Sequence, residues 1–261
     1  MKKNEIILDG KKSIYLVGDT HYPRGIRQKF QHVVETIKND RNSYMIGLGD
    51  WTEGISHLDP RYNPEEAHSI SQRGQENLNM INNQWDDFEE DIKPITSQIL
   101  GLHSGNHGSN VTRRYNSNYL ESLCKRNSLR YLGDEVAIWK FVSGEHSAVF
   151  QTEHGCGGGV TPGFAVNKAD AISRIFAGID VVAMGHTHKL SVDIGMQPMD
   201  VSGDDIKQVY QYRCNCGSFL PNYLVDSPSY GERKLYHPLP MGYVRVDMDD
   251  CVINNVAIVP L

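Results

Sequence analysis

One arrangement recurs along this chain: a short apolar run is followed by a glycine and then by side chains that can bind a metal ion. In its first example, Ser13–His21, an apolar run precedes Gly18, Asp19 and His21. Such a run predicts a buried β-strand. Residues i and i+2 of an extended backbone point to the same side, so Asp19 and His21 are expected to converge on one ion. Alone, an Asp-x-His pair is more often a turn aspartate followed by a surface histidine.

The same arrangement, or a close variant of it, occurs again further along the chain. The later stretches are Gly49-Asp50, Gly105-Asn106-His107, Glu153-His154-Gly155 and Gly185-His186-Thr187-His188. Unrelated polar residues would rarely end so many strands in this way, so we interpret them as parts of one site. The candidate ligands are Asp19, His21, Asp50, Asn106, His154, His186 and His188.

The first part of the chain has the order strand, helix, strand. Strands are predicted at 14–17 and 44–48, and the spacing of apolar residues within 23–38 predicts an amphipathic helix. This order implies a parallel pair whose carboxyl ends bring their ligands to the same edge of a sheet. Another strand at 5–8 is expected to pair with 14–17 through the turn Asp9-Gly10.

The rest of the chain adds an insertion, more strands and two helices. Residues 51–95 are expected to form a loop over the site, which includes His57, Arg61, Tyr62 and His68, followed by a helix. Further strands are predicted at 98–103, 136–142, 146–152 and 180–184, and helices at 119–127 and 167–176. The glycine-rich loop 155–159 lets backbone approach a ligand closely.

These elements predict one α/β (α+β) domain over residues 1–261. From residue 189 onward the alternation of residues is typical of antiparallel strands, so 189–261 is expected to be an antiparallel C-terminal part.

Composition excludes several classes of protein. The formal net charge of −6 argues against a protein that coats nucleic acid electrostatically. No apolar run is long enough to cross a membrane, and the five cysteines are odd in number and widely spread. We therefore expect a soluble cytoplasmic protein with reduced thiols. Cys214 and Cys216 are interpreted as small buried residues, with a metal pair as the alternative.

The candidate ligands are carboxylates, an amide and imidazoles, with no thiolate. They are too many for one ion and suit two divalent ions that share a bridging carboxylate, with Mn²⁺ favoured and Fe or Zn²⁺ as alternatives. Such a pair binds a phosphoryl group and lowers the pKa of a bridging water. The histidines outside these stretches, such as His103 and His146, are expected to be surface or hydrogen-bonded core residues.

In their order, the motifs from Gly18 to His188 resemble the calcineurin-like metallophosphoesterase superfamily, and in particular its small phage and prokaryotic members. The resemblance implies a β-sandwich of mixed sheets flanked by helices, with a dinuclear site at the strand ends. It implies that Asp19, His21 and His188 hold one metal ion, that Asp50 bridges, and that Asn106, His154 and His186 hold the second. His107 would be the general acid that protonates the leaving oxygen.

The sequence departs from the superfamily pattern at one position. The residue after the Asn-His pair is commonly Asp or Glu and here is Gly108, which removes the carboxylate that would support His107. Arg113 and Arg114 follow closely and are candidate phosphate-binding residues, with a solvated pair at a helix start as the alternative. Trp51 and Tyr62 are candidates for stacking on a base, or else packing residues.

The predicted activity is hydrolysis of phosphate mono- or diesters, with a nucleotide or a nucleic acid (DNA or RNA) as the favoured substrate and no membrane partner. The alternative is a catalytically weak protein that keeps the fold as a binding scaffold. The sequence leaves the natural substrate and any protein partner open.

Overall fold

The fold is described from a computed structural model of the whole chain. Its described residues are 1–55, 59, 62, 80–159, 161–197, 209–223, 232 and 237–261. Most of the predicted loop over the site, with His57, Arg61 and His68, lies outside these residues.

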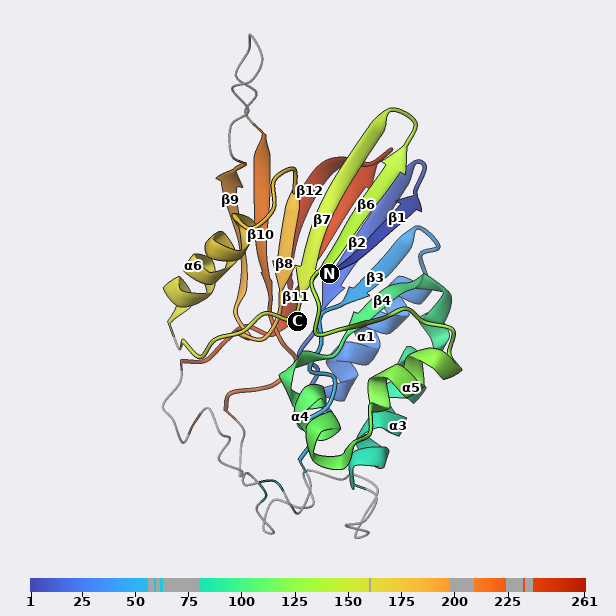
Figure 1. Cartoon of the computed structure of the whole chain (residues 1–261), viewed down its shortest axis with the longest axis vertical. Helices are drawn as coiled ribbons and strands as arrows, with labels where there is room; N and C mark the ends of the chain where they lie inside the picture. The colour runs from blue at the N-terminus through green and yellow to red at the C-terminus, as the bar shows by residue number, and fades with distance from the viewer. Residues whose placement is uncertain are drawn as a thin grey trace.

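Two six-stranded mixed sheets form the centre of the molecule (Figure 1). One sheet has the order β1-β6-β7-β8-β10-β9 and the other the order β12-β11-β2-β3-β4-β5. The strands are β1 Lys2–Ile7, β2 Lys11–Val17, β3 Ser43–Gly47, β4 Ile99–His103, β5 Tyr131–Gly133, β6 Ala137–Ser143, β7 His146–Glu153, β8 Val181–Met184, β9 Leu190–Met196, β10 Tyr210–Cys216, β11 Gly242–Asp249 and β12 Val252–Pro260.

The helices cover the outer faces of the sheets. They are α1 Arg27–Lys38, α3 Met80–Ile92, the 3₁₀ helix η3 Lys93–Gln98, α4 Gly105–Tyr115, α5 Tyr119–Arg126 and α6 Pro162–Ser173. Figure 1 shows α6 beside β8, β9 and β10, whereas α1, α3, α4 and α5 gather at the other side. The expected fold class, mixed sheets flanked by helices, is confirmed.

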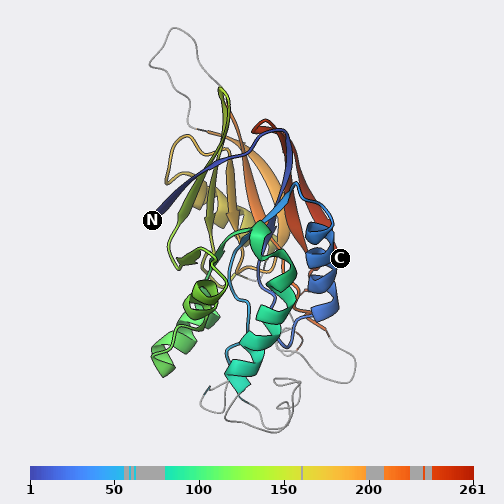
Figure 2. The same ribbon diagram turned by 90° about the vertical axis from the view of Figure 1, so that its right-hand side faces the viewer.

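The apolar run of β2 is continuous because this strand is buried on both faces. Ile14 and Leu16 belong to the core between the two sheets, which also contains Trp139 and Phe150. Tyr15 and Val17 point the other way and join the core beneath α1 and α3. A third, smaller core lies between α6 and the sheet that contains β8. Figure 2 shows this layered arrangement from a second direction.

The predicted pairing of the first two strands is wrong. β1 pairs in parallel with β6, whereas β2 pairs with β3 and β11 in the other sheet. The turn between them is real, since the amide of Gly10 donates to the Asp250 carboxylate at 2.6 Å. It carries the chain from one sheet to the other instead of closing a hairpin. The periodicity of β1 shows that it is a strand but not which sheet it joins.

The C-terminal strands pair antiparallel in two pairs, β9 with β10 and β11 with β12. Each pair extends a different sheet, and β10 is also parallel to β8. Cys214 and Cys216 lie buried on β10, as small core residues, which agrees with the interpretation from sequence. Burial raises the pKa of both thiols well above the ordinary value.

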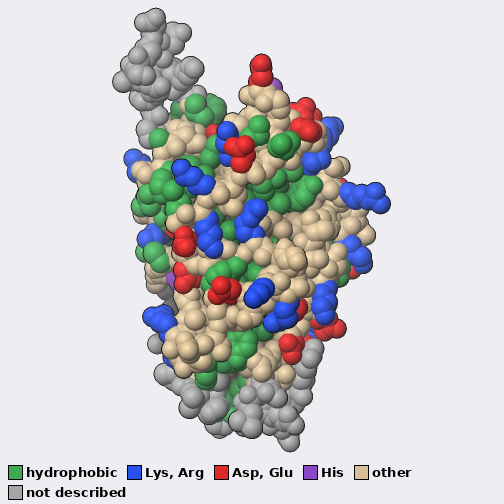
Figure 3. All heavy atoms as spheres, turned by 45° about the vertical axis from the view of Figure 1, so that its right-hand side comes forward, with side chains coloured by type: hydrophobic (Ala, Val, Ile, Leu, Met, Phe, Trp, Pro, Cys, Tyr) green, Lys and Arg blue, Asp and Glu red, His purple; other side chains and the backbone are tan. Residues whose placement is uncertain are grey.

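The surface in the view of Figure 3 carries basic and acidic side chains that are interspersed, with hydrophobic side chains between them. Such a mixture agrees with the modest negative net charge. Within the described part of the chain, no helix combines the length and the apolar character needed to span a membrane.

Candidate metal site at the strand ends

The candidate ligands lie just beyond the carboxyl ends of strands from both sheets. Asp19 and His21 follow β2, and Asp50 follows β3. Asn106 lies in the first turn of α4, directly after β4, and His154 follows β7. His186 and His188 follow β8. The parallel strands of each sheet end at the same edge, so packing of the two sheets brings these loops together.

Most of these ligand residues have an unusual backbone conformation. Asp19, His21, Asp50, His186 and His188 all have positive φ, between 50° and 65°. This left-handed region costs about 1–3 kcal/mol for a non-glycine residue and is concentrated at functional sites. The expected extended backbone at Asp19 and His21 is therefore wrong, although their side chains do converge, with His21 Nε2 3.6 Å from Asp19 Oδ1.

Glycines before the ligands allow close backbone approach. At Gly105, with φ of +77°, a Cβ atom would lie 2.3 Å from the Asp50 Oδ1 atom. At Gly49, with φ of +101°, a Cβ atom would lie 2.9 Å from the His154 Nδ1 atom. The recurring glycine is thus a steric requirement of bringing the ligand loops together.

The first group of ligand atoms comes from Asp19, His21 and His188. The His188 Nε2 atom lies 3.2 Å from Asp19 Oδ1 and 3.0 Å from His21 Nε2. Asp19 Oδ1 lies 3.6 Å from His21 Nε2, is buried, and has no hydrogen-bond partner. A buried carboxylate oxygen without a partner is costly unless a cation or a donor satisfies it.

The second group comes from Asp50, Asn106, His154 and His186. The His154 Nε2 atom lies 2.9 Å from Asn106 Oδ1, 3.2 Å from Asp50 Oδ2 and 3.2 Å from His186 Nδ1. The Asn106 Oδ1 and His186 Nδ1 atoms are 2.7 Å apart. Ligand atoms bound at about 2.0–2.2 Å to one ion lie about 3 Å from one another, which these distances match.

Backbone carbonyls fix the tautomers of both histidines in the second group. His154 donates from Nδ1 to the Leu48 carbonyl at 2.8 Å, and His186 donates from Nε2 to the Gly157 carbonyl at 2.7 Å. The opposite ring nitrogens therefore carry lone pairs toward Asn106 and Asp50 when the rings are neutral. Four acceptor atoms that face one another at hydrogen-bond distance fit a divalent cation.

In the metal-free protein, protons on the histidine rings supply the positive charge at the site. Burial opposes protonation of His154, but the Asp50 and Asp19 carboxylates outweigh it and raise the pKa of His154 to about 9. Burial likewise opposes protonation of His21, but Asp19 and Glu53 raise its pKa to about 10. The pKa of Asp19 is held well below its usual value, against its burial, by His188 and His21. The site thus stabilises positive charge.

His107 faces the same site from α4, and its side chain is 14% exposed. It donates from Nδ1 to the Glu53 carbonyl at 2.8 Å, and its Nε2 atom lies 3.8 Å from Asp50 Oδ2. The Glu53 carboxylate lies 3.8 Å from His107 Nδ1 and 3.2 Å from His21 Nδ1. Glu53 therefore supplies the carboxylate that Gly108 cannot.

Glu53 was not identified from the sequence, and Glu153, the acidic residue next to His154, does not take this position. Glu153 accepts instead from the Gln151 side chain at 3.0 Å. A signal was available in the sequence: Glu53 is the first charged residue after Asp50 and lies between the apolar residues Trp51 and Ile55. The loops after β2 and β3 run in parallel, with the Tyr22 amide bonded to Trp51 and the Glu53 amide to Tyr22, and this pairing holds Glu53 beside His21.

The remaining candidates lie outside the ligand groups. Arg113 bonds to Asn110 on its own helix, and Arg114 pairs with Asp59. Trp51 is fully buried, donates to the His103 carbonyl, and stacks on Phe88, so the idea that it stacks on a base is wrong. Tyr62 is half-buried and packs against Ile55 and Met80.

His103 is a hydrogen-bonded core residue, as expected. Its ring is fully buried, and Nε2 lies 3.0 Å from the Thr152 hydroxyl. Burial, reinforced by the charge of His154, lowers the pKa of His103 to about 3. The folded state therefore keeps this ring neutral under conditions in which an unfolded histidine is protonated.

This neutral histidine predicts loss of stability in acid. Below the unfolded pKa of about 6.5 the unfolded chain binds a proton that the folded chain refuses, so stability falls as the pH decreases toward about 3. His103→Gln removes this contribution. From pH 6.5 to pH 5, the variant should lose about 1.5–2 kcal/mol less unfolding free energy than the wild type. Urea unfolding at both pH values measures this, and equal losses would contradict a neutral His103.

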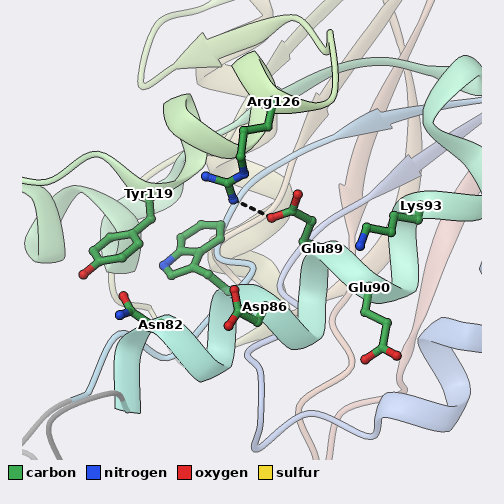
Figure 4. Close-up of a pocket in the computed structure, with 8 residues that line it drawn as sticks. Asn82, Asp86, Glu89, Glu90, Lys93, Tyr119 and Arg126 are labelled. Carbon is green, nitrogen blue, oxygen red and sulfur yellow. Dashed lines mark hydrogen bonds and ion pairs between the residues drawn. The ribbon is translucent and has the colours of Figure 1, made fainter.

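A separate cavity of about 510 Å³ lies between α3 and α5, away from the ligand groups (Figure 4). Trp85 and Tyr119 line it with nearly parallel rings, 6.4 Å apart. Arg126 reaches across it to the Glu89 carboxylate. None of the candidate ligands lines this cavity.

No protein-family profile matches this chain, and no curated protein matches it. The solved structures that it resembles include the following three. One is a conserved uncharacterized protein from Streptococcus pneumoniae described as a predicted phosphoesterase, at 16% identity and a TM-score of 0.38, with 96% of this chain and 90% of that chain covered.

The second is Vacuolar Protein Sorting 29 from Cryptosporidium parvum, at 15% identity and a TM-score of 0.40, with 97% and 99% covered. The third is the calcineurin-like phosphoesterase YfkN from Bacillus subtilis, at 11% identity and a TM-score of 0.37, with 96% and 91% covered. Likeness at these identities and TM-scores carries no conclusion about the activity of this chain. Any activity has to follow from this chain's own residues.

Proposed function

We propose that this chain, whose fold is that of the calcineurin-like phosphoesterases, hydrolyses phosphate mono- or diesters with two bound divalent metal ions. The observation that carries the proposal is the second ligand group. Carbonyl oxygens fix the tautomers of His154 and His186, so that four acceptor atoms face one another at 2.7–3.2 Å. A cation resolves this arrangement, whereas an apolar or purely structural role does not.

The spacing of the ligand atoms supports the two sets that the resemblance implies. Asp19, His21 and His188 would hold one ion, and Asn106, His154 and His186 the other. Asp50 would bridge: its Oδ2 atom lies with the second set, and its Oδ1 atom accepts from the His107 amide at 2.9 Å. When bound, such an ion pair activates water and offsets the charge of a phosphoryl group. The nitrogen and oxygen donors suit Mn²⁺, Fe or Zn²⁺ better than soft ions, and Mn²⁺ is the ion that we propose.

His107 would supply the proton for the leaving oxygen. Its Nδ1–H is held by the Glu53 carbonyl, which leaves Nε2 as the atom that faces the site. The nearby carboxylates of Glu53 and Asp50 stabilise the protonated ring. A proton held on Nε2 is therefore placed for transfer to a departing alkoxide.

A nucleotide or nucleic acid is proposed as the substrate class, on the motif resemblance. Phosphate binding by Arg113 and Arg114 is kept as a prediction, although their present partners, Asn110 and Asp59, turn them to other contacts.

The proposal is tested by metal content and by a substrate panel. Protein reconstituted with Mn²⁺ should contain about two ions per chain and hydrolyse at least one ester among p-nitrophenyl mono- and diesters, cyclic nucleotides and single- and double-stranded DNA. A chelator should abolish the activity, and Mn²⁺ should restore it. His146→Ala, at an exposed histidine outside the site, is the control and should keep both ions. Ions without hydrolysis would favour the scaffold alternative, and no bound ion would refute the proposal.

A further inference from the structure

The glycine-rich loop 155–159 brings backbone close to one ligand of the site, His186. Its Gly157 carbonyl lies 2.7 Å from the Nε2 atom of His186, on the side of the ring opposite the other ligands. A carbonyl oxygen only accepts, so this contact requires the proton of a neutral His186 to lie on Nε2. The Nδ1 lone pair is then directed at Asn106 and His154.

The carbonyl partner of His186 is less firmly held in the fold than the carbonyl partner of His154. The partner of His154, the Leu48 carbonyl, lies directly after β3 and is buried within the sheet packing. The partner of His186 lies in a loop of exposed and half-exposed residues outside both sheets. A flexible glycine-rich segment cannot hold a carbonyl in place by itself, because glycine has the largest conformational freedom.

The side chain that this loop encloses is Phe164, in the first turn of α6. A Cβ atom at Gly157 would lie 2.6 Å from the Phe164 Cζ atom, and one at Gly159 would lie 2.0 Å from its Cγ atom. At Gly158, between them, a Cβ atom would meet nothing within 4 Å. The glycines on either side of Gly158 therefore lie against the aromatic ring.

We infer that Phe164 is a positioning residue for the second metal ion. Its ring holds the loop so that the Gly157 carbonyl fixes the His186 tautomer, which presents Nδ1 to the ion. The inference rests on the proposed function, since it concerns one of the two proposed metal sites. Carbonyl partners of ligating histidines typically change metal affinity by about 10–100-fold when they are lost.

Phe164→Ala should therefore weaken binding of the second Mn²⁺ by about 10–100-fold and leave the first ion bound with unchanged affinity. Titration calorimetry with Mn²⁺ on the full chain measures both affinities. Phe176→Ala is the matched control, because Phe176 is also half-buried but packs against the small core beneath α6. Equal affinities in Phe164→Ala and wild type, or equal loss in the control, would overturn the inference.

A pair of alanine substitutions tests the same contact from the loop side. Gly159→Ala places a methyl group into the Phe164 ring, so the loop or the ring must move, whereas Gly158→Ala points into open space. Gly159→Ala should weaken binding of the second Mn²⁺ ion to a degree similar to Phe164→Ala, whereas Gly158→Ala should leave this affinity unchanged. In the double variant Phe164→Ala/Gly159→Ala the ring is gone, although a Cβ atom at residue 159 would still lie 2.5 Å from the Cβ atom of residue 164. Its loss should therefore be smaller than the sum of the two single losses. Additive losses would contradict a shared mechanism.

The tautomer itself provides a measurement that does not depend on metal or activity. In ¹⁵N-labelled metal-free protein at high pH, where the rings are neutral, His186 should show a proton on Nε2 alone. Phe164→Ala should give a mixture of tautomers at His186 while His154 stays unchanged. An unchanged His186 tautomer would overturn the positioning role. Wild-type protein that binds fewer than two ions would instead refute the proposed function and leave the tautomer result standing.

Discussion

Asp50→Asn is expected to remove or weaken both metal ions and to reduce phosphoesterase activity by about 10³-fold or more. This factor corresponds to a loss of about 4 kcal/mol of transition-state stabilisation by the metal ions. The substitution keeps the shape of the side chain. It also keeps an oxygen that can accept from the His107 amide, which lies 2.9 Å from Asp50 Oδ1 in the wild type. It removes the buried negative charge, which is only 2% exposed. The effect should therefore come from charge and not from folding.

Metal analysis of two variants distinguishes bridging from single-site binding. His21→Ala should lose the ion of the first group and keep the second, because the His21 ring lies against Asp19 and His188. The contact of His21 with Asp50 is a backbone hydrogen bond, from its amide to the Asp50 carbonyl, which alanine preserves. Asp50→Asn should lose affinity at both. If both variants retained one tightly bound ion, Asp50 would be a ligand of the second group only. Unfolding free energies measured without metal check that both variants are folded.

His107→Ala should slow hydrolysis of esters with poor leaving groups much more than hydrolysis of esters with good leaving groups. A general acid matters most when the departing oxygen is an alkoxide, because proton transfer relieves the charge that develops there. The variant should lose about 10²–10⁴-fold on an alkyl or nucleotide ester. It should lose much less on a p-nitrophenyl ester, since p-nitrophenolate leaves readily as an anion. Steady-state rates on a matched pair of esters measure the difference.

Glu53 gives this prediction an internal control. It accepts from His107 Nδ1 through its carbonyl, which a side-chain substitution preserves, and its carboxylate stabilises the protonated ring. Glu53→Gln should therefore reproduce part of the leaving-group dependence of His107→Ala. Metal content should stay at the wild-type level in His107→Ala, because His107 is not one of the proposed ligands. Equal losses on both esters with metal retained would mean that His107 positions the substrate and donates no proton.

Periodicity and residue chemistry along the chain predicted most of the architecture. The apolar runs of β2, β3 and β8 identify buried strands because a strand covered on both faces has to be apolar throughout. Asp50 and His154 were recognised as candidate ligands because each follows such a strand beside a glycine. These features are local, so they can be read from a single segment without knowledge of its neighbours.

Other features of the same stretches depended on contacts between segments far apart in the sequence. His186 and His188 are two residues apart yet lie in different ligand groups, and nothing in their own segment specifies which group each joins. β1 joined the sheet of β6 and not that of β2, since an alternating pattern does not specify a partner. The amphipathic pattern within 23–38 likewise did not show that α1 begins only at Arg27.

The sequence by itself determined the set of side chains that could bind metal and the strands that carry them, because ligand chemistry and hydrophobic periodicity are properties of short segments. The division of that set into two groups came from the resemblance of the motifs, and only the tertiary structure decided what supports each group. Glu53 beside His107, and the Gly157 carbonyl against His186, result from the packing of loops that belong to different strands. Distances between such loops depend on how the two sheets pack, and no local pattern encodes them.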